Sequence, residues 1–282
     1  MTHILALIDG SAYTHSVCDH AAWAARQYSG DIELLHVLNS RPLGKLPPDL
    51  SGAIGLGARS ALLENLAEHD AQAAHLAKER GRAILDAAQL RLESQGDIQV
   101  SLALRHGEIA DSLVKRAGDL IVMGKRGEDA YANKPALGSN LERVIRAVHR
   151  PVLIASSVYK PFSQAVFAFD DGVSARKALD SLITNPMAER INITVLSVTD
   201  PGSEVAQAGE KAATHLSAAG YAATAKSLPG LAERVIAEET EREGTDLLIM
   251  GAYGHSRIRN LIIGSTTTAL IRSSQSSLLL FR

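Results

Sequence analysis

An internal repeat is the feature that most constrains the fold of this chain. The sequence Asp-Leu-Ile-Val-Met-Gly at residues 119–124 returns as Asp-Leu-Leu-Ile-Met-Gly at residues 246–251. Each copy is followed by a Gly-Ser pair, at 138–139 and 264–265. An earlier apolar run ends in Asp9 in one half and in Asp170 in the other. Landmarks in the same order predict a duplicated domain, with a joint near residues 156–164.

Each half alternates short apolar runs with helical patterns, which predicts βαβ units, a parallel sheet and an α/β fold. We expect strands at 3–8, 32–38, 99–104, 120–124 and 151–155, and again at 165–169, 192–198, 222–227, 246–250 and 277–281. We expect helices at 13–28, 61–95, 108–117 and 139–148, and again at 174–185, 203–219, 231–242 and 265–273. Right-handed crossovers then give two tandem doubly wound, Rossmann-like domains, at 1–157 and 162–282.

The two halves differ after the second expected strand. The first half carries an insertion at about 40–60 that is rich in proline and glycine, and an alanine-rich segment, 61–95, follows it. Turn chemistry predicts a loop for the insertion, and propensity predicts a helix for the second segment, with a possible kink at Gly81. The insertion is either a tolerated surface loop or a lid or oligomer contact.

The run 247–266 of the second half has the features of a phosphate-binding loop. An apolar strand ends at Gly251, Gly254 follows, and a helix is expected to start at Gly264-Ser265. Glycines allow the backbone to approach a ligand closely, and the free N–H groups of a helix N-terminus bind anions. No Gly-Lys-Ser/Thr follows, so this is not a Walker A loop, and the dinucleotide fingerprint Gly-x-Gly-x-x-Gly is absent.

This glycine spacing, together with the repeated strands and Gly-Ser pairs, resembles the ATP-binding signature of the universal stress protein family. The resemblance covers nearly the whole chain twice and implies a tandem universal stress protein. It implies five parallel strands in each domain, in an adenine nucleotide alpha-hydrolase-like arrangement, and a role in the stress response. It also implies an adenine nucleotide, ATP or ADP/AMP, with Mg²⁺. The residues implied to hold it in the second half are Asp170, Val198, Gly251, Gly254, Gly264, Ser265 and Thr266.

The first half departs from that pattern, so we expect a weaker site there. Ten residues, rather than nine, separate the second and third glycines of its loop. Glu128 and Asp129 add negative charge, which Lys125 and Arg126 could offset, and Pro135 removes a backbone donor. The matching positions are Asp9, Val37, Gly124, Gly127, Gly138 and Ser139.

The final apolar runs of the halves, 151–155 and 277–281, suggest how the domains join. In the resembled family the last strands pair across a two-fold axis to form homodimers, which implies a homodimer here as well. Covalent duplication would instead let these two runs meet within one chain. That pairing buries two apolar strand edges.

Composition and charge exclude several classes of partner. The net charge of −2 gives no indication of nucleic-acid binding. The sequence has no run of 18 apolar residues, so no membrane-spanning helix is predicted. The single cysteine, Cys18, excludes an internal disulfide and fits the cytoplasm. The start of the chain has the pattern of a strand and not of a signal peptide. The ten histidines lack zinc-type spacing, so we expect no metal site, although His255 lies in the phosphate loop.

No residue set shows the spacing of a nucleophile, base and orienting group, so we assign no catalytic residue. The sequence supports three functional hypotheses. The chain is a cytoplasmic regulator that binds ATP mainly in its second domain and changes its contacts with an unknown protein partner. Alternatively it is a slow ATP hydrolase, or a structural module that binds partners without a nucleotide.

Overall fold

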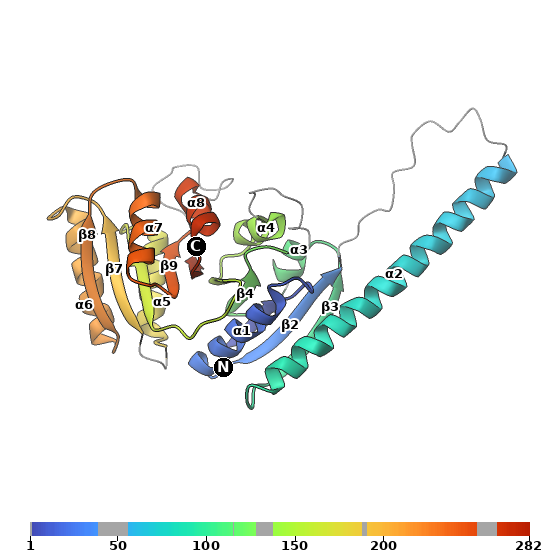
Figure 1. Ribbon diagram of the computed structural model, residues 1–282, viewed down its shortest axis with the longest axis horizontal. Helices are drawn as coiled ribbons and strands as arrows, with labels where there is room; N and C mark the ends of the chain where they lie inside the picture. The colour runs from blue at the N-terminus through green and yellow to red at the C-terminus, as the bar shows by residue number, and fades with distance from the viewer. Residues whose placement is uncertain (1, 39–55, 115, 128–137, 188–190, 253–263) are drawn as a thin grey trace.

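The computed structural model describes residues 2–38, 56–114, 116–127, 138–187, 191–252 and 264–282. In this part of the chain one ten-stranded sheet runs through both halves, in the order β3-β2-β1-β4-β5-β10-β9-β6-β7-β8 (Figure 1). The strands are β1 (His3–Leu7), β2 (Asp31–Leu38), β3 (Val100–His106), β4 (Leu120–Gly124), β5 (Val152–Ala155), β6 (Gln164–Ala168), β7 (Asn192–Val198), β8 (Ala222–Leu228), β9 (Leu247–Gly251) and β10 (Ser277–Phe281).

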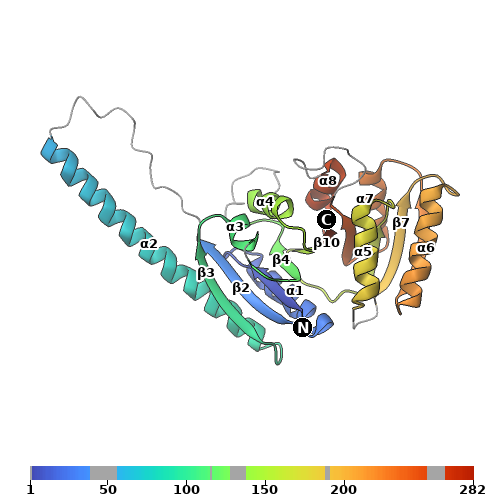
Figure 2. The same ribbon diagram turned by 180° about the vertical axis from the view of Figure 1, so that it is seen from behind.

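Helices cover both faces of this sheet, and two apolar cores result (Figure 2). Helices α1, α2, α5 and α6 contribute to the core that contains Trp23 and Phe167, and α3, α4, α7 and α8 to the core that contains Leu141 and Ile271. The helices are α1 (Thr14–Tyr28), α2 (Leu56–Glu93), α3 (Ile109–Val114), α4 (Ser139–Ala147), α5 (Val173–Thr184), α6 (Glu204–Ala218), α7 (Ala232–Arg242) and α8 (Ser265–Ser273). The predicted α/β fold, with two tandem five-stranded parallel units, is confirmed.

The halves join through β5 and β10, which pair antiparallel, with Leu153 opposite Leu279. Every other strand pair in the described sheet is parallel. The expectation that 151–155 and 277–281 meet within one chain is therefore confirmed. Both strands are buried, so the pairing removes two apolar edges from solvent.

The aspartates that begin the repeated strand motif, Asp119 and Asp246, have a structural role at the amino ends of the strands. Asp119 accepts a hydrogen bond from the backbone N–H of His3, at 2.8 Å. Asp246 accepts bonds from the backbone N–H groups of Ser163, at 3.0 Å, and Gln164, at 3.2 Å. Each carboxylate therefore ties the start of one strand to the start of its neighbour, β4 to β1 and β9 to β6.

Helix α2 begins at Leu56, so the prediction that 56–60 belong to a loop is wrong. Favourable propensities of Leu56, Ala58 and Arg59 outweigh the cost of Gly57. The helix continues through Gly81, where a Cβ atom would lie 2.9 Å from the ring of His36. Gly209 of α6 lies against Ser197 at the matching place, so the part of α2 before Leu76 is extra to the repeat. Residues 40–55 of the insertion lie outside the described part.

His20 of α1 connects the two halves beside the β5–β10 pair. Its Nδ1 donates to the carbonyl of Ser16, at 2.6 Å, because a carbonyl oxygen only accepts. Nε2 of the neutral ring then accepts from the hydroxyl of Ser277 in β10, at 2.7 Å. The side chain is fully buried, and this burial lowers the pKa of His20 to about 4.

Replacing Leu153 by alanine tests the joint between the halves. Leu153 is fully buried in β5, so we expect Leu153→Ala to lower the free energy of unfolding by about 2–5 kcal/mol. Leu90→Ala is the matched control, because Leu90 is 68% exposed, and it should change that free energy by less than about 0.5 kcal/mol. Urea unfolding measures both, and equal costs would contradict the described packing of β5.

Acid should weaken the protein through His20. Between pH 6.5 and 4 the unfolded chain binds a proton on His20 that the folded chain does not. Stability that is complete above pH 6.5 should fall by roughly 3 kcal/mol as the pH drops towards 4. Urea unfolding of His20→Gln at several pH values should give a shallower pH dependence. His75→Gln changes an exposed histidine of α2 and should keep the wild-type slope; a shared slope for all three proteins would refute this assignment.

Candidate functional site

The carboxyl ends of β1 and β4 define one candidate site, and those of β6 and β9 define a second. In each half the chain winds outward in both directions from this strand pair, since β2 flanks β1 and β7 flanks β6 on the other side. Ligands of doubly wound sheets bind at such reversal points. Asp9 follows β1 and Asp170 follows β6, while Gly124 and Gly251 end β4 and β9.

The structure brings together the predicted residues of the first domain. Oδ1 of Asp9 accepts the N–H of Ser11, at 3.0 Å. A Cβ atom at Gly127 would lie 2.7 Å from Oδ2 of Asp9, so glycine lets this loop approach the carboxylate without displacing the Asp9 side chain. A Cβ atom at Gly138 would lie 3.3 Å from the carbonyl oxygen of Lys125, which places the start of α4 on the same loop. Val37 is half-buried near the end of β2.

The second domain places its described residues in the same frame. Oδ1 of Asp170 accepts the N–H of Gly172, at 2.9 Å. Gly251 lies against the start of α5, where a Cβ atom would be 2.8 Å from Cβ of Ser174. Gly264 precedes α8, whose first two residues are the exposed Ser265 and the half-buried Thr266. Val198 is half-buried at the end of β7. Gly254 and His255 lie outside the described residues.

A glycine precedes each helix that starts at these sites, Gly138 before α4 and Gly264 before α8. Within the described part of the chain neither glycine N-cap supplies a side-chain cap. The first N–H groups of a helix have no partner within the helix and carry a partial positive charge. The two helix starts can therefore bind an anion through backbone groups.

Charged groups near the sites differ from the sequence expectation. The side chain of Lys125 leaves the first domain. Its Nζ donates to the carbonyl of Ser274, at 2.5 Å, and to that of Ser276, at 2.8 Å. Burial lowers the pKa of Lys125 to about 8. Arg126 is exposed, whereas Glu128, Asp129 and Pro135 lie outside the described residues.

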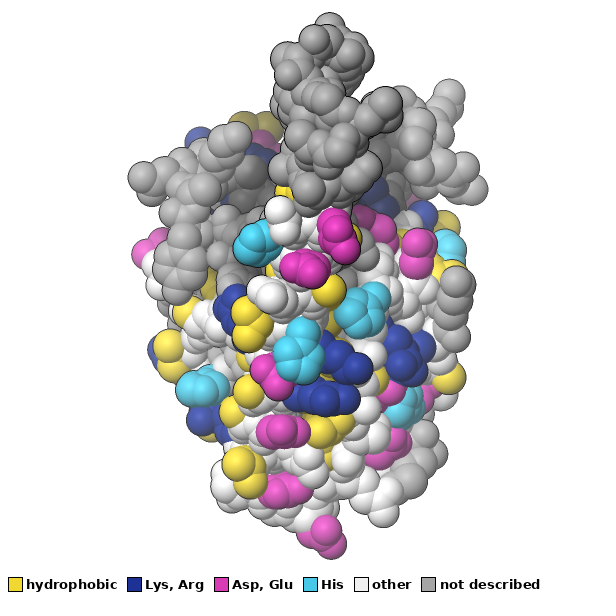
Figure 3. Space-filling view, turned by 90° about the vertical axis from the view of Figure 1, so that its right-hand side faces the viewer, with side chains coloured by type: hydrophobic (Ala, Val, Ile, Leu, Met, Phe, Trp, Pro, Cys, Tyr) yellow, Lys and Arg dark blue, Asp and Glu magenta, His cyan; other side chains and the backbone are white. Residues whose placement is uncertain are grey.

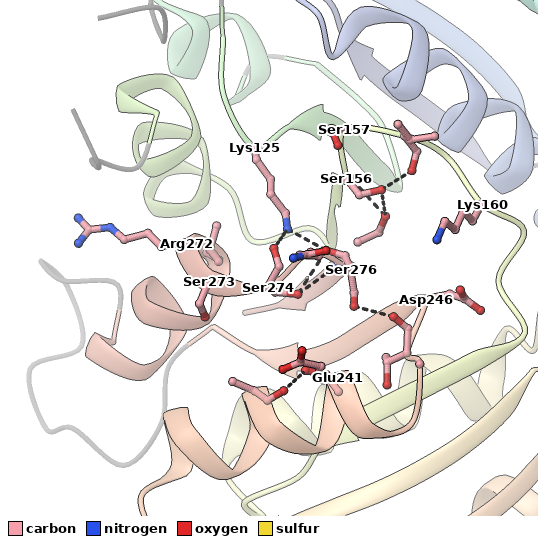
Figure 4. Close-up of a pocket in the computed structure, with 18 of the residues that line it drawn as sticks. Lys125, Ser156, Ser157, Lys160, Glu241, Asp246, Arg272, Ser273, Ser274 and Ser276 are labelled. Carbon is pink, nitrogen blue, oxygen red and sulfur yellow. Dashed lines mark hydrogen bonds between the residues drawn. The ribbon is translucent and has the colours of Figure 1, made fainter. Parts of the chain in front are cut away.

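A cavity of about 800 Å³ lies between the domains, beside the Lys125 side chain (Figure 4). Its lining includes Ser156 and Lys160 from the segment that connects the halves, and Ser276 from the turn before β10. The described nucleotide-site residues predicted from the sequence do not line it. The cavity therefore adjoins the loop of the first domain through Lys125 and Arg126, although the predicted site residues themselves are not part of its lining.

Sequence reasoning missed Thr267, which positions α8. Its hydroxyl donates to the carbonyl of Ala252, at 3.2 Å, and the side chain is buried. This bond ties the first turn of α8 to the residue after β9. Thr266, which was singled out instead, has only a long contact of 3.5 Å from Oγ1 to Oε2 of Glu233. The three consecutive threonines, 266–268, are equivalent in the sequence, and only the helical phase separates them.

Other groups of interest have structural explanations. Cys18 is fully buried, as expected, and burial raises the pKa of its thiol to about 12. Nδ1 of His36 donates to the carbonyl of Ile8, at 2.7 Å. Across the described residues, no group of three or more His, Cys, Asp or Glu side chains is arranged to hold a metal ion. The helices in the same part of the chain include none long and apolar enough to cross a membrane.

Comparisons with known proteins agree with this architecture. The model of the universal stress protein family matches twice, at residues 1–156 and 161–282. The chain is a tandem universal stress protein. A universal stress protein of Synechocystis is 34% identical over the full length of both chains. One from Methanocaldococcus jannaschii is 27% identical over 54% of this chain and 80% of its own. A universal stress protein structure from Archaeoglobus fulgidus covers 99% of this chain and 98% of its own, with a TM-score of 0.70 and 18% identity.

Thr267→Val should destabilise this universal stress protein, because valine has the same shape but cannot donate to the Ala252 carbonyl. We expect a loss of about 1–2 kcal/mol in the free energy of unfolding, measured in urea. Thr266→Val is the matched control in the same helical turn, and it should cost less than about 0.5 kcal/mol. Equal losses would show that the Thr267 hydroxyl does not hold α8.

Proposed function

We propose that this universal stress protein binds ATP, or another adenine nucleotide, and acts as a nucleotide-dependent regulator of the stress response rather than as a fast enzyme. One observation carries the proposal. In each domain a helix with a glycine N-cap, for which the described residues supply no side-chain cap, starts at the same end of the sheet as an aspartate, Asp9 or Asp170. A helix N-terminus suits phosphates, and a carboxylate suits the hydroxyls of a ribose or the amino group of an adenine.

The second domain is proposed as the main site, since its loop keeps the expected glycine spacing. Asp170 and Val198 would contact the adenine and ribose. The phosphates would lie against backbone N–H groups from Gly251, Gly254, Gly264, Ser265 and Thr266. The first domain would bind more weakly through Asp9, Val37, Gly124, Gly127, Gly138 and Ser139.

Glu233 at the start of α7 bears on the proposed Mg²⁺. Its Oε2 lies 3.5 Å from the hydroxyl of Thr266, beside the proposed phosphate position. A bare carboxylate there would repel phosphate, but Mg²⁺ binds carboxylates and phosphates together. Binding of ATP in the second domain should therefore be stronger with Mg²⁺ than without it.

The Asp170 carboxylate can be tested against its neighbour. We expect Asp170→Asn to weaken ATP binding in the second domain roughly tenfold or more, because a charged acceptor is replaced by a neutral one. The matched control is Asp171→Asn, because Asp171 pairs with Arg176 at the surface and asparagine tolerates its positive φ of 58°. Calorimetry with ATP and Mg²⁺ measures both. Equal affinities for the two variants would remove Asp170 from the site.

Release of bound nucleotide from the natively purified chain tests the proposal as a whole. About one adenine nucleotide per chain after denaturation would support one competent domain, and two would support both. Steady phosphate release that is lost in Gly254→Val, with the fold intact, would favour a slow hydrolase. No nucleotide and no uptake of ATP would contradict the proposal.

The extension of α2 favours an interaction module as the second candidate function. Between Glu64 and Arg80, every side chain except the half-buried Ala73 is exposed, including Leu66 and Leu76. Figure 3 views the molecule from its α2 side, where acidic, basic and histidine side chains share the surface. A homodimer, also proposed, would have to use a surface other than the edges of β5 and β10, because these strands are already paired within the chain.

A further inference from the structure

Lys125 belongs to the loop of the first domain but ends in the second. It directly follows Gly124, and its own carbonyl oxygen lies against Gly138 at the start of α4. Its side chain crosses between the halves, and Nζ donates to the carbonyls of Ser274 and Ser276 (Figure 4). One residue therefore contacts the proposed phosphate loop of one domain and the helix end of the other.

The two acceptors lie at the carboxyl end of α8. Ser274 is the C-cap of this helix, and carbonyl oxygens there carry a partial negative charge that a cation stabilises. The same turn contacts the residues before β9, because the Ser276 hydroxyl also donates to the carbonyl of Thr245, at 2.6 Å. The other end of α8 is the proposed phosphate position at Gly264 and Ser265. A helix of nine residues spans roughly 13 Å, so the two ends belong to one short rigid element.

The repeat does not duplicate this connection. The residue that matches Lys125 in the second domain is Ala252, whose side chain is buried and cannot cross to the first domain. The carboxyl end of α4 does receive a cation from the other half, since Arg282 donates to the carbonyls of Arg146 and Val148. Arg282, however, follows β10 and lies outside the second domain's glycine loop. Of the described cations that bridge the halves in this way, Lys125 alone starts from a proposed phosphate loop.

We propose that Lys125 couples the two sites, so that nucleotide bound at the start of α8 orders the glycine loop of the first domain. An anion at the N-terminus fixes the first turn of α8, and the rigid helix then holds its terminal carbonyls in place. Lys125 transmits this order to residues 124–127, and the coupling is positive because the loop is already ordered when its own ligand arrives. The inference rests on the proposed function and assigns a positioning role to Lys125.

Hydrogen exchange on the full chain tests the coupling. The Asp9→Asn background disables the first site, and calorimetry confirms one ATP per chain. On adding ATP and Mg²⁺, amides at 264–267 should be protected from exchange. Amides at 124–127 should exchange roughly fivefold more slowly, which is the lower end of the usual range for allosteric coupling between two sites. With Lys125→Met added, residues 264–267 should keep their protection while residues 124–127 lose theirs.

Two controls separate coupling from simple destabilisation. Arg126→Met, in the Asp9→Asn background, changes the next residue, which is an exposed cation. In this variant ATP should slow amide exchange at 124–127 as much as it does in Asp9→Asn alone. Lys125→Arg keeps a cationic donor, so ATP should still slow amide exchange at 124–127 by most of the amount seen with Lys125. Protection at 264–267 without slower exchange at 124–127 overturns the coupling, and this result needs no Lys125 variant. Equal protection at 124–127 in Lys125→Met also overturns it. A lack of ATP uptake in calorimetry would instead refute nucleotide binding. ATP uptake without protection at 264–267 would show that the nucleotide does not contact the start of α8, and would also overturn the coupling.

Discussion

The antiparallel pairing of β5 with β10 is the constraint on which the rest of this structure depends. Two five-stranded parallel sheets would each present an apolar outer strand, and the pairing of Leu153 with Leu279 turns these edges into the centre of one sheet. The same contact brings His20 to Ser277, Lys125 to the end of α8, and Arg282 to the end of α4. The contacts that His20, Lys125 and Arg282 make between the halves therefore depend on the β5–β10 pairing.

The duplication preserves the backbone frame but not the side chains placed on it. Gly81 and Gly209 occupy the same place in the helix after the second strand, yet one lies against His36 and the other against Ser197. Helix α2 is longer than α6 by an N-terminal part, which is mostly exposed from Glu64 onward. Lys125 and Ala252 occupy matching positions, but only the longer Lys125 side chain extends to the other half. Identical frames can therefore hold sites of unequal strength, since backbone groups supply the common chemistry and side chains supply the differences.

The candidate sites are built mainly from backbone groups, which favours binding over catalysis. Glycines at 127 and 138 let the chain approach the Asp9 carboxylate and the Lys125 carbonyl, where a Cβ atom would lie only 2.7 Å and 3.3 Å away, respectively. Uncapped helix starts supply partial positive charge without a titratable group. Phosphoryl transfer needs a positioned water and compensation of charge on the transferred group. Lys125, one of the two cations between Gly124 and Gly127 of the first loop, joins the domains instead.

The sequence by itself determined the repeat, the order of strands and helices, and the family. It did so because alternating apolar runs, glycines and Gly-Ser pairs depend on local chemistry. The strand-end positions of Asp9 and Asp170 followed from the same pattern. Only the tertiary structure decided that Lys125 leaves its loop, that Thr267 rather than Thr266 holds α8, and that Asp119 and Asp246 tie strand starts together. These roles depend on which distant backbone groups lie within reach of a side chain. The packing of strands and helices within each half creates that proximity for Thr267, Asp119 and Asp246, and the joining of the halves in one sheet creates it for Lys125.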